Sequence, residues 1–348
     1  MSEAEEAPKK KKQKNKPKSS FKKVSAFLVG FIVVAVFAGS AFSFWLAKGF
    51  TRSWVLQEDK VVVIPSGSGV ARIATILHDE GIIADPLAFR IVLRFNKLDK
   101  GLKAGEYLFP AKVTPKKVAR ILEEGKTVLH RVTFPEGLTS VEMIGLLNGE
   151  EGLDDLVLQT PAEGTLLPET YTFSRGMKRS QVVDQMQRAM SKTLDELWAK
   201  RQDGLPLKNK QEALILASIV EKETGVSSER GKVAGVFINR LNKRMRLQTD
   251  PTVVYGITLG QEPLGRPLSK KDLKTPTPYN TYTNFGLPPT PITNPGRASL
   301  EAVMNPTETK ALYFVADGTG GHAFANSLKE HNRNVSKWRR IERSRKAN

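Results

Sequence analysis

The chain has 348 residues, 40% of them hydrophobic, which is enough for about two domains with a buried core. It has no cysteine, which excludes a disulfide scaffold, a cysteine nucleophile, an iron–sulfur cluster and a thiolate zinc site. The formal charge of +18 is concentrated at the ends: residues 1–23 hold nine Lys against three Glu, and residues 329–346 hold eight Lys or Arg against two Glu. The body between them is only mildly basic, so we do not expect a nucleic-acid partner.

Residues 24–47 form an uncharged, proline-free apolar segment directly after the lysine-rich N-terminus. As a helix, this segment would extend about 36 Å, enough to cross a bilayer. Because lysines are concentrated before it, the positive-inside rule places the N-terminus in the cytoplasm and residues 48–348 on the outer side. A cleaved signal peptide is the alternative, since Gly39-Ser40-Ala41 supplies small residues, but the apolar run continues well beyond them.

Residues 60–147 contain two similar strand–turn–helix units. Pro65-x-Gly67 and, seventy positions later, Pro135-x-Gly137 each precede apolar residues at helical spacing. The predicted elements of this region are strands over Val61–Ile64, Gly105–Phe109 and Arg131–Phe134, and a helix between Thr114 and Gly125. Such units resemble LysM-type modules, which hold glycan strands. A generic small α+β domain without a ligand is the alternative.

Two helices are predicted next. Residues 179–201 have the apolar spacing of an amphipathic helix with a packing role. Asn209 and Glu212 form a capping box for the second helix. Its run Ala213–Val220 is apolar on all sides and should be buried, and Gly225 is the expected C-terminal stop.

This buried helix ends in two glutamates, Glu221 and Glu223. Burial and the negative end of the helix dipole both raise the pKa of a carboxyl, which suits a general acid for a glycosidic bond. Glu223 lies over larger apolar side chains than Glu221 and is the better candidate. The residues alone leave open that both are solvated charges at a helix end.

Two shorter helices are expected after this point. Ser228 is the predicted N-cap of the first, and Asp250-Pro251 caps and starts the second, which Gly256 ends. Capping accounts for Asp250 but not for Gln248 and Tyr255, which remain candidates for substrate contact.

Residues 276–296 are rich in proline and predict a rigid, extended loop. Its aromatic and amide side chains suit sugar recognition, because rings stack on sugar faces and amides bond hydroxyl and acetamido groups. Packing within the loop is the alternative. These side chains are Tyr279, Asn280, Tyr282, Asn284 and Asn294. A hairpin is predicted around the glycine-rich turn 317–321, where His322 either reaches a site or is structural.

Seven sequence blocks, in order, closely resemble the YceG-like family of endolytic murein transglycosylases over roughly 160–335. These blocks are Ala217–Thr224, Val236–Leu241, Leu247–Val253, Tyr279–Tyr282, Gly286–Pro289, Asn294–Gly296 and Tyr313–Ala316. The resemblance implies an α+β chain with one transmembrane helix, a small LysM-like module and a catalytic domain over 150–340 that contains a buried catalytic helix.

The resemblance also implies an enzyme anchored in the bacterial cytoplasmic (inner) membrane that cuts nascent peptidoglycan glycan strands on the outer, periplasmic side. Glu223, the glutamate followed by Thr, would act first as acid and then as base, leaving a 1,6-anhydro-MurNAc end without metal or cofactor. The predicted substrate contacts are Gln248, Tyr255, Asn280, Tyr282 and Asn294. Glycan strands and the membrane are the expected partners, and peptidoglycan synthases are candidate partners.

Three alternatives rank lower. A lysozyme-like muramidase would use Glu223 with Asp250 as the second carboxylate. A membrane-tethered, non-catalytic protein would bind peptidoglycan through residues 60–147. Binding of nucleic acid through the two basic tails is the third.

Overall fold

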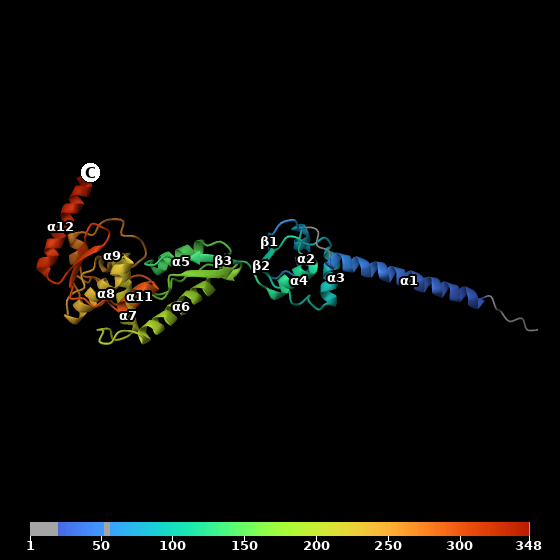
Figure 1. Ribbon diagram of the computed structural model, residues 1–348, viewed down its shortest axis with the longest axis horizontal. Coiled ribbons are helices and arrows are strands. Elements are labelled where there is room, and N and C mark those ends of the chain that lie inside the picture. The colour runs from blue at the N-terminus through green and yellow to red at the C-terminus, as the bar shows by residue number, and fades with distance from the viewer. Residues whose placement is uncertain (1–19, 52–55, 348) are drawn as a thin grey trace, which may run out of the picture. The chain divides into compact units, whose positions relative to one another are not determined.

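The computed structural model describes residues 20–51 and 56–347, in two compact units, Met1–Thr127 and Val128–Asn348 (Figure 1). The fold is mixed α+β, as predicted, and the described strands form four two-stranded sheets. The predicted apolar segment lies within helix α1 (Ser20–Thr51). Among the described helices, α1 alone is long and apolar enough to cross a membrane, judged by length and composition. Most of the lysine-rich tail 1–23 lies outside the described residues.

The first unit contains one antiparallel strand pair and three short helices. They are β1 (Lys60–Ile64), α2 (Val70–Asp79), α3 (Pro86–Phe95), β2 (Gly105–Phe109) and α4 (Pro115–Glu124). Val62 pairs with Tyr107, and both side chains are buried in the core of this unit. The predicted start and stop of α4 are confirmed, because the Thr114 hydroxyl accepts a bond from an amide of the first turn and Gly125 ends the helix at φ 72°. The prediction did not include α3, although Asp85-Pro86 is a clear cap signal.

The boundary between the units falls inside the range 60–147. Strand β3 (Leu129–Thr133) and helix α5 (Ser140–Gly149) belong to the second unit. β3 pairs antiparallel with β5 (Thr170–Ser174), and the two strands share a core with helix α6 (Arg179–Ala199). The two similar sequence units therefore do not form one module, since the second is covered by elements that follow it.

The rest of the second unit surrounds one buried helix, α7 (Lys210–Glu223). The other elements are β4 (Leu153–Asp154), β6 (Met177–Lys178), α8 (Ser227–Asn242), α9 (Asp250–Thr258), α10 (Lys270–Lys274), α11 (Arg297–Met304), β7 (Tyr313–Ala316), β8 (His322–Ala325) and α12 (Leu328–Ala347). Every side chain from Ala213 to Val220 is at most 5% exposed, which confirms the predicted burial. Helices α8 and α11 lie against α7 (Figure 1), so the position of its last turn is determined by packing along its whole length.

The ends of α7 and α8 differ from the prediction. Thr224 ends α7 in an extended conformation at φ −146°, and its hydroxyl accepts a bond from the Val226 N–H at 3.0 Å. This side-chain turn replaces the left-handed stop expected at Gly225. Helix α8 then starts at Ser227, with Val226 rather than Ser228 in the cap position.

The prediction for α9 was also wrong at both ends. Asp250 is the first residue of the helix rather than its cap, which is Thr249. The helix continues past Gly256 to Thr258. Gly256 has a packing role instead, because a Cβ at this position would lie 2.4 Å from the Thr277 hydroxyl oxygen.

Candidate active site

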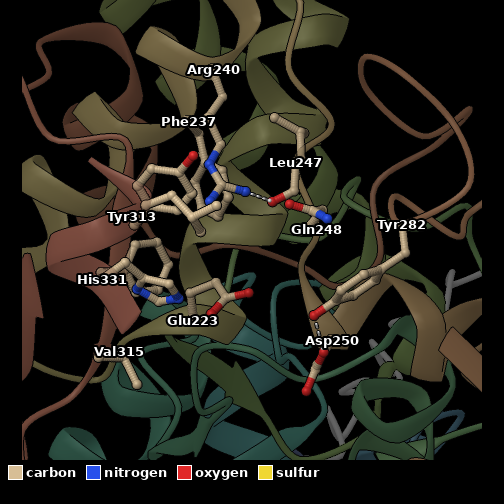
Figure 2. Close-up of a pocket in the computed structure, with 12 residues that line it drawn as sticks. Glu223, Phe237, Arg240, Leu247, Gln248, Asp250, Tyr282, Tyr313, Val315 and His331 are labelled. Atoms are coloured by element: carbon tan, nitrogen blue, oxygen red, sulfur yellow. Dashed lines mark hydrogen bonds between the residues drawn. The ribbon is translucent and has the colours of Figure 1, made fainter. Parts of the chain in front are cut away.

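A cavity of about 500 Å³ lies at the C-terminal end of α7. Its lining comes from α7, α8, the segment before α9 and the first residue of α9, the 276–296 loop, β7 and the first turn of α12. Figure 2 shows the Glu223 side chain within this cavity, with Gln248, Tyr282 and Asp250 on one side and His331 and Val315 on the other.

Glu223 is the last residue of α7 and the only cavity-lining residue that this helix contributes. Burial is the main cause that raises its pKa, and the nearby carboxylate of Asp250 raises it further. The Thr249 hydroxyl donates a hydrogen bond to Glu223 Oε1 and lowers the pKa, as do His322 and Arg240 nearby. The net effect favours the protonated carboxyl, which can donate a proton to a substrate.

Glu221, two residues earlier, has a different environment. Its side chain is 5% exposed and lies 3.7 Å from the Arg230 guanidinium. Its second carboxylate oxygen accepts the Gly296 N–H at 2.8 Å. Glu221 is thus buried and paired away from the cavity, and the alternative of two solvated helix-end charges is wrong for both glutamates.

Gln248 and Tyr282, two of the predicted substrate contacts, do line the cavity with Glu223. The Tyr282 hydroxyl donates to Asp250 Oδ1 at 2.6 Å, so the carboxylate that was expected to cap α9 instead orients a tyrosine. Gln248 adopts a left-handed backbone conformation at φ 49°, and its side chain is exposed at the cavity. A non-glycine residue in this region is uncommon and often marks a functional position.

Asn280 and Asn294, two further predicted substrate contacts, are not among the residues that line the cavity. Both are fully buried. The Asn280 amide donates to the Thr275 carbonyl at 2.8 Å, and Asn294 accepts the Leu166 N–H at 3.0 Å. Their polar atoms are used to hold the 276–296 loop in place and are not available to a ligand.

The remaining aromatic and amide candidates have packing roles as well. Tyr255 is 9% exposed and packs edge to face against Tyr279 at 4.9 Å between ring centroids, outside the cavity. The Tyr279 hydroxyl lies 2.8 Å from that of Thr290, and Asn284 donates to the Thr277 carbonyl at 2.7 Å. For most of the loop, the packing alternative describes the side chains correctly.

Several cavity residues were missed by the sequence analysis. Arg240 on α8 donates to the carbonyls of Leu247 and Leu312 at 2.8 and 2.6 Å and so joins two walls of the cavity. His331 comes from α12, a segment that we had treated only as a basic tail, and its ring stacks on Tyr313 at 5.1 Å. Burial lowers the pKa of His331. Apolar residues at helical spacing could have predicted α12, but the many charged residues among them obscured this pattern.

His322 begins β8 in the predicted hairpin. Its Nδ1 lies 2.8 Å from Glu229 Oε2, and its backbone N–H donates to Glu229 Oε1 at 2.9 Å. It is not among the cavity-lining residues. Its effect on Glu223 is electrostatic: it lowers the pKa of the Glu223 carboxyl.

Within residues 20–51 and 56–347, no three His, Asp or Glu side chains are grouped so that they could hold a metal ion. The titratable groups that meet in the cavity are Glu223, Asp250, Tyr282, Tyr313, Arg240 and His331. This arrangement can transfer a proton from one protonated carboxyl, Glu223, to a ligand that lies among polar and aromatic side chains.

A family model described as the YceG-like family matches residues 62–337. The chain is 32% identical to the endolytic murein transglycosylase of Bacillus subtilis, over 79% of this chain and 83% of that relative. It is 30% identical to the endolytic murein transglycosylase of Streptococcus pneumoniae, over 90% of this chain and 65% of that relative. A crystal structure of a YceG-like protein from Listeria monocytogenes aligns with a TM-score of 0.48 and 32% identity, covering 80% of this chain and 99% of that one.

Proposed function

The chain belongs to the YceG-like family, and from this premise we propose that it is a lyase that cleaves peptidoglycan glycan strands internally, as a membrane-anchored endolytic murein transglycosylase. The observation that carries the proposal is Glu223, a carboxyl with a raised pKa that opens into a cavity at the end of a buried helix. The names of its relatives support peptidoglycan as the substrate.

In the proposed mechanism, the protonated carboxyl of Glu223 gives its proton to the glycosidic oxygen between MurNAc and GlcNAc as the C1–O bond breaks. The N-acetyl oxygen of the substrate stabilises the oxocarbenium-like carbon. Glu223, now a carboxylate, removes the proton from the C6 hydroxyl of MurNAc, and O6 bonds to C1 to close the 1,6-anhydro ring. One carboxyl thus serves as acid and then as base.

Gln248 and Tyr282 would hold the reacting sugars, because they are the predicted contacts that share the cavity with Glu223. Arg240 and Thr249 would act on the reaction indirectly, Arg240 by supporting two walls and Thr249 by orienting the Glu223 carboxyl.

A lysozyme-like hydrolase is the second candidate, because Asp250 lines the same cavity as Glu223. Such an enzyme needs two carboxyls with separate roles, one as acid and one as nucleophile or base. The Tyr282 hydroxyl donates to Asp250 Oδ1, which gives this carboxylate a role in orienting Tyr282 and leaves Oδ2 for the second candidate mechanism.

The deciding experiment is mass spectrometry of the fragments that the full chain releases from purified peptidoglycan. We expect 1,6-anhydro-MurNAc ends from the wild type and none from Glu223→Gln. Glu221→Gln is the matched control, because glutamine can still accept the Gly296 N–H outside the cavity, and it should cleave normally. Reducing ends, together with complete loss of cleavage in Asp250→Asn, would establish the hydrolase instead.

The proposal places the catalytic unit outside the bacterial cytoplasmic membrane, with the N-terminus in the cytoplasm. This placement is supported by the apolar helix α1 and by the lysines before it. Glycan binding by the LysM-like region 60–147 and contact with peptidoglycan synthases are also proposed.

A further inference from the structure

A second cavity, of about 530 Å³, lies beside the segment that leads from α8 to Gln248. Leu241, Arg244, Met245, Phe285 and Gly286 line it. The two cavities share their supporting elements. α8 supplies Arg240 to the first cavity and Leu241 to the second, and the 276–296 loop supplies Tyr282 to the first and Phe285 to the second.

The segment 244–248, which lines both cavities, is held by one backbone hydrogen bond and by the Arg240 side chain. The Met245 N–H donates to the Arg240 carbonyl at 2.8 Å, and Arg240 Nη1 donates to the carbonyls of Arg246 and Leu247 at 3.3 and 2.8 Å. Arg244 and Met245 line the second cavity and Leu247 and Gln248 line the first, so a ligand that follows this segment would contact both.

The second cavity presents an aromatic ring and cationic groups. Phe285 is 65% exposed, and the Arg246 guanidinium lies 4.6 Å from the centroid of its ring. Arg244 is exposed on the same segment. Arg244 has a left-handed backbone, with φ 51°, because it ends α8 in a Schellman motif, in which its N–H bonds to the Leu241 carbonyl at 3.1 Å.

We propose that this second cavity binds the glycan strand beyond the sugars at Glu223, with a sugar face stacked on Phe285 and the stem-peptide carboxylates paired with Arg244 and Arg246. The inference rests on the proposed function and deepens it. A strand that is cut internally continues on both sides of the reacting bond, so an enzyme of this kind needs contacts away from the reacting sugars. Exposed aromatic rings match the apolar faces of sugars, and guanidinium groups pair with carboxylates.

The test measures the Kd of the full chain in detergent, carrying Glu223→Gln so that bound strands are not cut. The probes are soluble, uncrosslinked peptidoglycan strands with their stem peptides, and the same strands after amidase has removed the peptides. We expect Phe285→Ala to raise the Kd for both probes about three- to tenfold, the size typical of one aromatic stacking contact. Phe285→Leu, which keeps an apolar side chain but no ring, should bind as weakly as Phe285→Ala.

The double variant Arg244→Gln, Arg246→Gln should weaken binding of strands that carry peptides more than binding of stripped strands, which keep only the lactyl carboxylates, and the difference should shrink at high salt. Leu158→Ala is the matched control, since Leu158 is 89% exposed in the same unit and lies outside both cavities, and it should leave the Kd unchanged. Circular dichroism confirms that each variant is folded.

The outcomes separate the subsite from the proposed function. If Glu223→Gln binds strands and the wild type cuts them, but the Phe285 and arginine variants bind equally well, the subsite is wrong and the function stands. If a folded wild type neither cuts nor binds strands, both fail. An equal loss of affinity for both probes in the double arginine variant would overturn the assignment of these arginines to the peptides.

Discussion

The pKa of Glu223 is set by opposing influences from its neighbours. Burial and the Asp250 carboxylate raise it, and the Thr249 hydroxyl, His322 and Arg240 lower it. At the end of α7 the helix dipole also disfavours the charged carboxylate. A group balanced in this way can donate a proton and then hold the resulting charge, which a two-step acid–base role requires.

Removing the Thr249 hydroxyl should raise the pKa of Glu223, because the hydroxyl donates to the charged carboxylate. In Thr249→Val the acid stays protonated to a higher pH, so the alkaline limb of kcat/KM should move upward by about one pH unit. The pH profile of glycan cleavage is the measurement. Thr249→Ser keeps a hydroxyl and should leave the limb in place; a downward shift in Thr249→Val would contradict the assignment.

Glu163 is a second buried carboxyl, outside the cavity. One oxygen accepts the Ser140 N–H at 2.9 Å, and the other is buried without a hydrogen-bond partner among the described residues. Burial raises its pKa to about 7. Because the folded-state pKa exceeds the unfolded one, its contribution to the free energy of unfolding falls as pH rises to about 7 and then levels off.

Between pH 5 and pH 8, the free energy of unfolding of the wild type should therefore fall by about 2 kcal/mol more than that of Glu163→Gln. Glutamine keeps the acceptor for Ser140 and does not titrate. Urea unfolding of both proteins at the two pH values measures the difference. Glu262→Gln, at an exposed carboxylate, is the control, and a wild type whose pH dependence equals that of Glu163→Gln would show that Glu163 does not titrate in this range.

Among the elements, α6 and the end of α5 are linked by one buried arginine in addition to their shared apolar core. Arg179, 7% exposed in the first turn of α6, donates to the carbonyls of Leu147 and Leu153 at 2.8 and 2.6 Å. It also donates to the carbonyls of Asn148, Glu150 and Asp155. These carbonyls lie at the end of α5 and at β4, so one guanidinium satisfies several acceptors that α5 cannot satisfy itself.

Arg179→Lys should lower the free energy of unfolding by about 2–4 kcal/mol, because a lysine cannot reproduce the planar fork and leaves buried carbonyls unpaired. Urea denaturation of the full chain, followed by circular dichroism, measures the loss. Arg188→Lys is the control on the exposed side of the same helix. Equal stability of the two variants would refute this account.

For the whole molecule, α1 is the feature that decides location. We expect the full chain to remain in the membrane fraction after alkaline carbonate extraction, because the apolar part of α1 is long enough to span a bilayer. The mass of the extracted protein should include its N-terminal lysines. A soluble product that begins near Ala41 would instead establish a cleaved signal peptide.

The two units also show how far local patterns extend. Apart from α3, the strands, caps and helices of 60–147 were predicted close to their observed positions, since alternation and cap residues act within a few neighbours. Which of them pack together was not predictable, because β3 pairs with β5 some forty positions later along the chain. A similar pattern in two segments does not determine a shared core.

The sequence by itself determined the apolar helix α1, the burial of α7 and the candidacy of Glu223, since each depends on composition and spacing within one segment. The tertiary structure decided which glutamate faces the cavity, because Arg230 and Gly296 engage Glu221 from other elements. It also turned Asn280 and Asn294 inward and brought His331 from α12 to the cavity. The residue type determines the chemistry of a side chain. Its access to a ligand depends on distant segments, which either cover the side chain or leave it exposed.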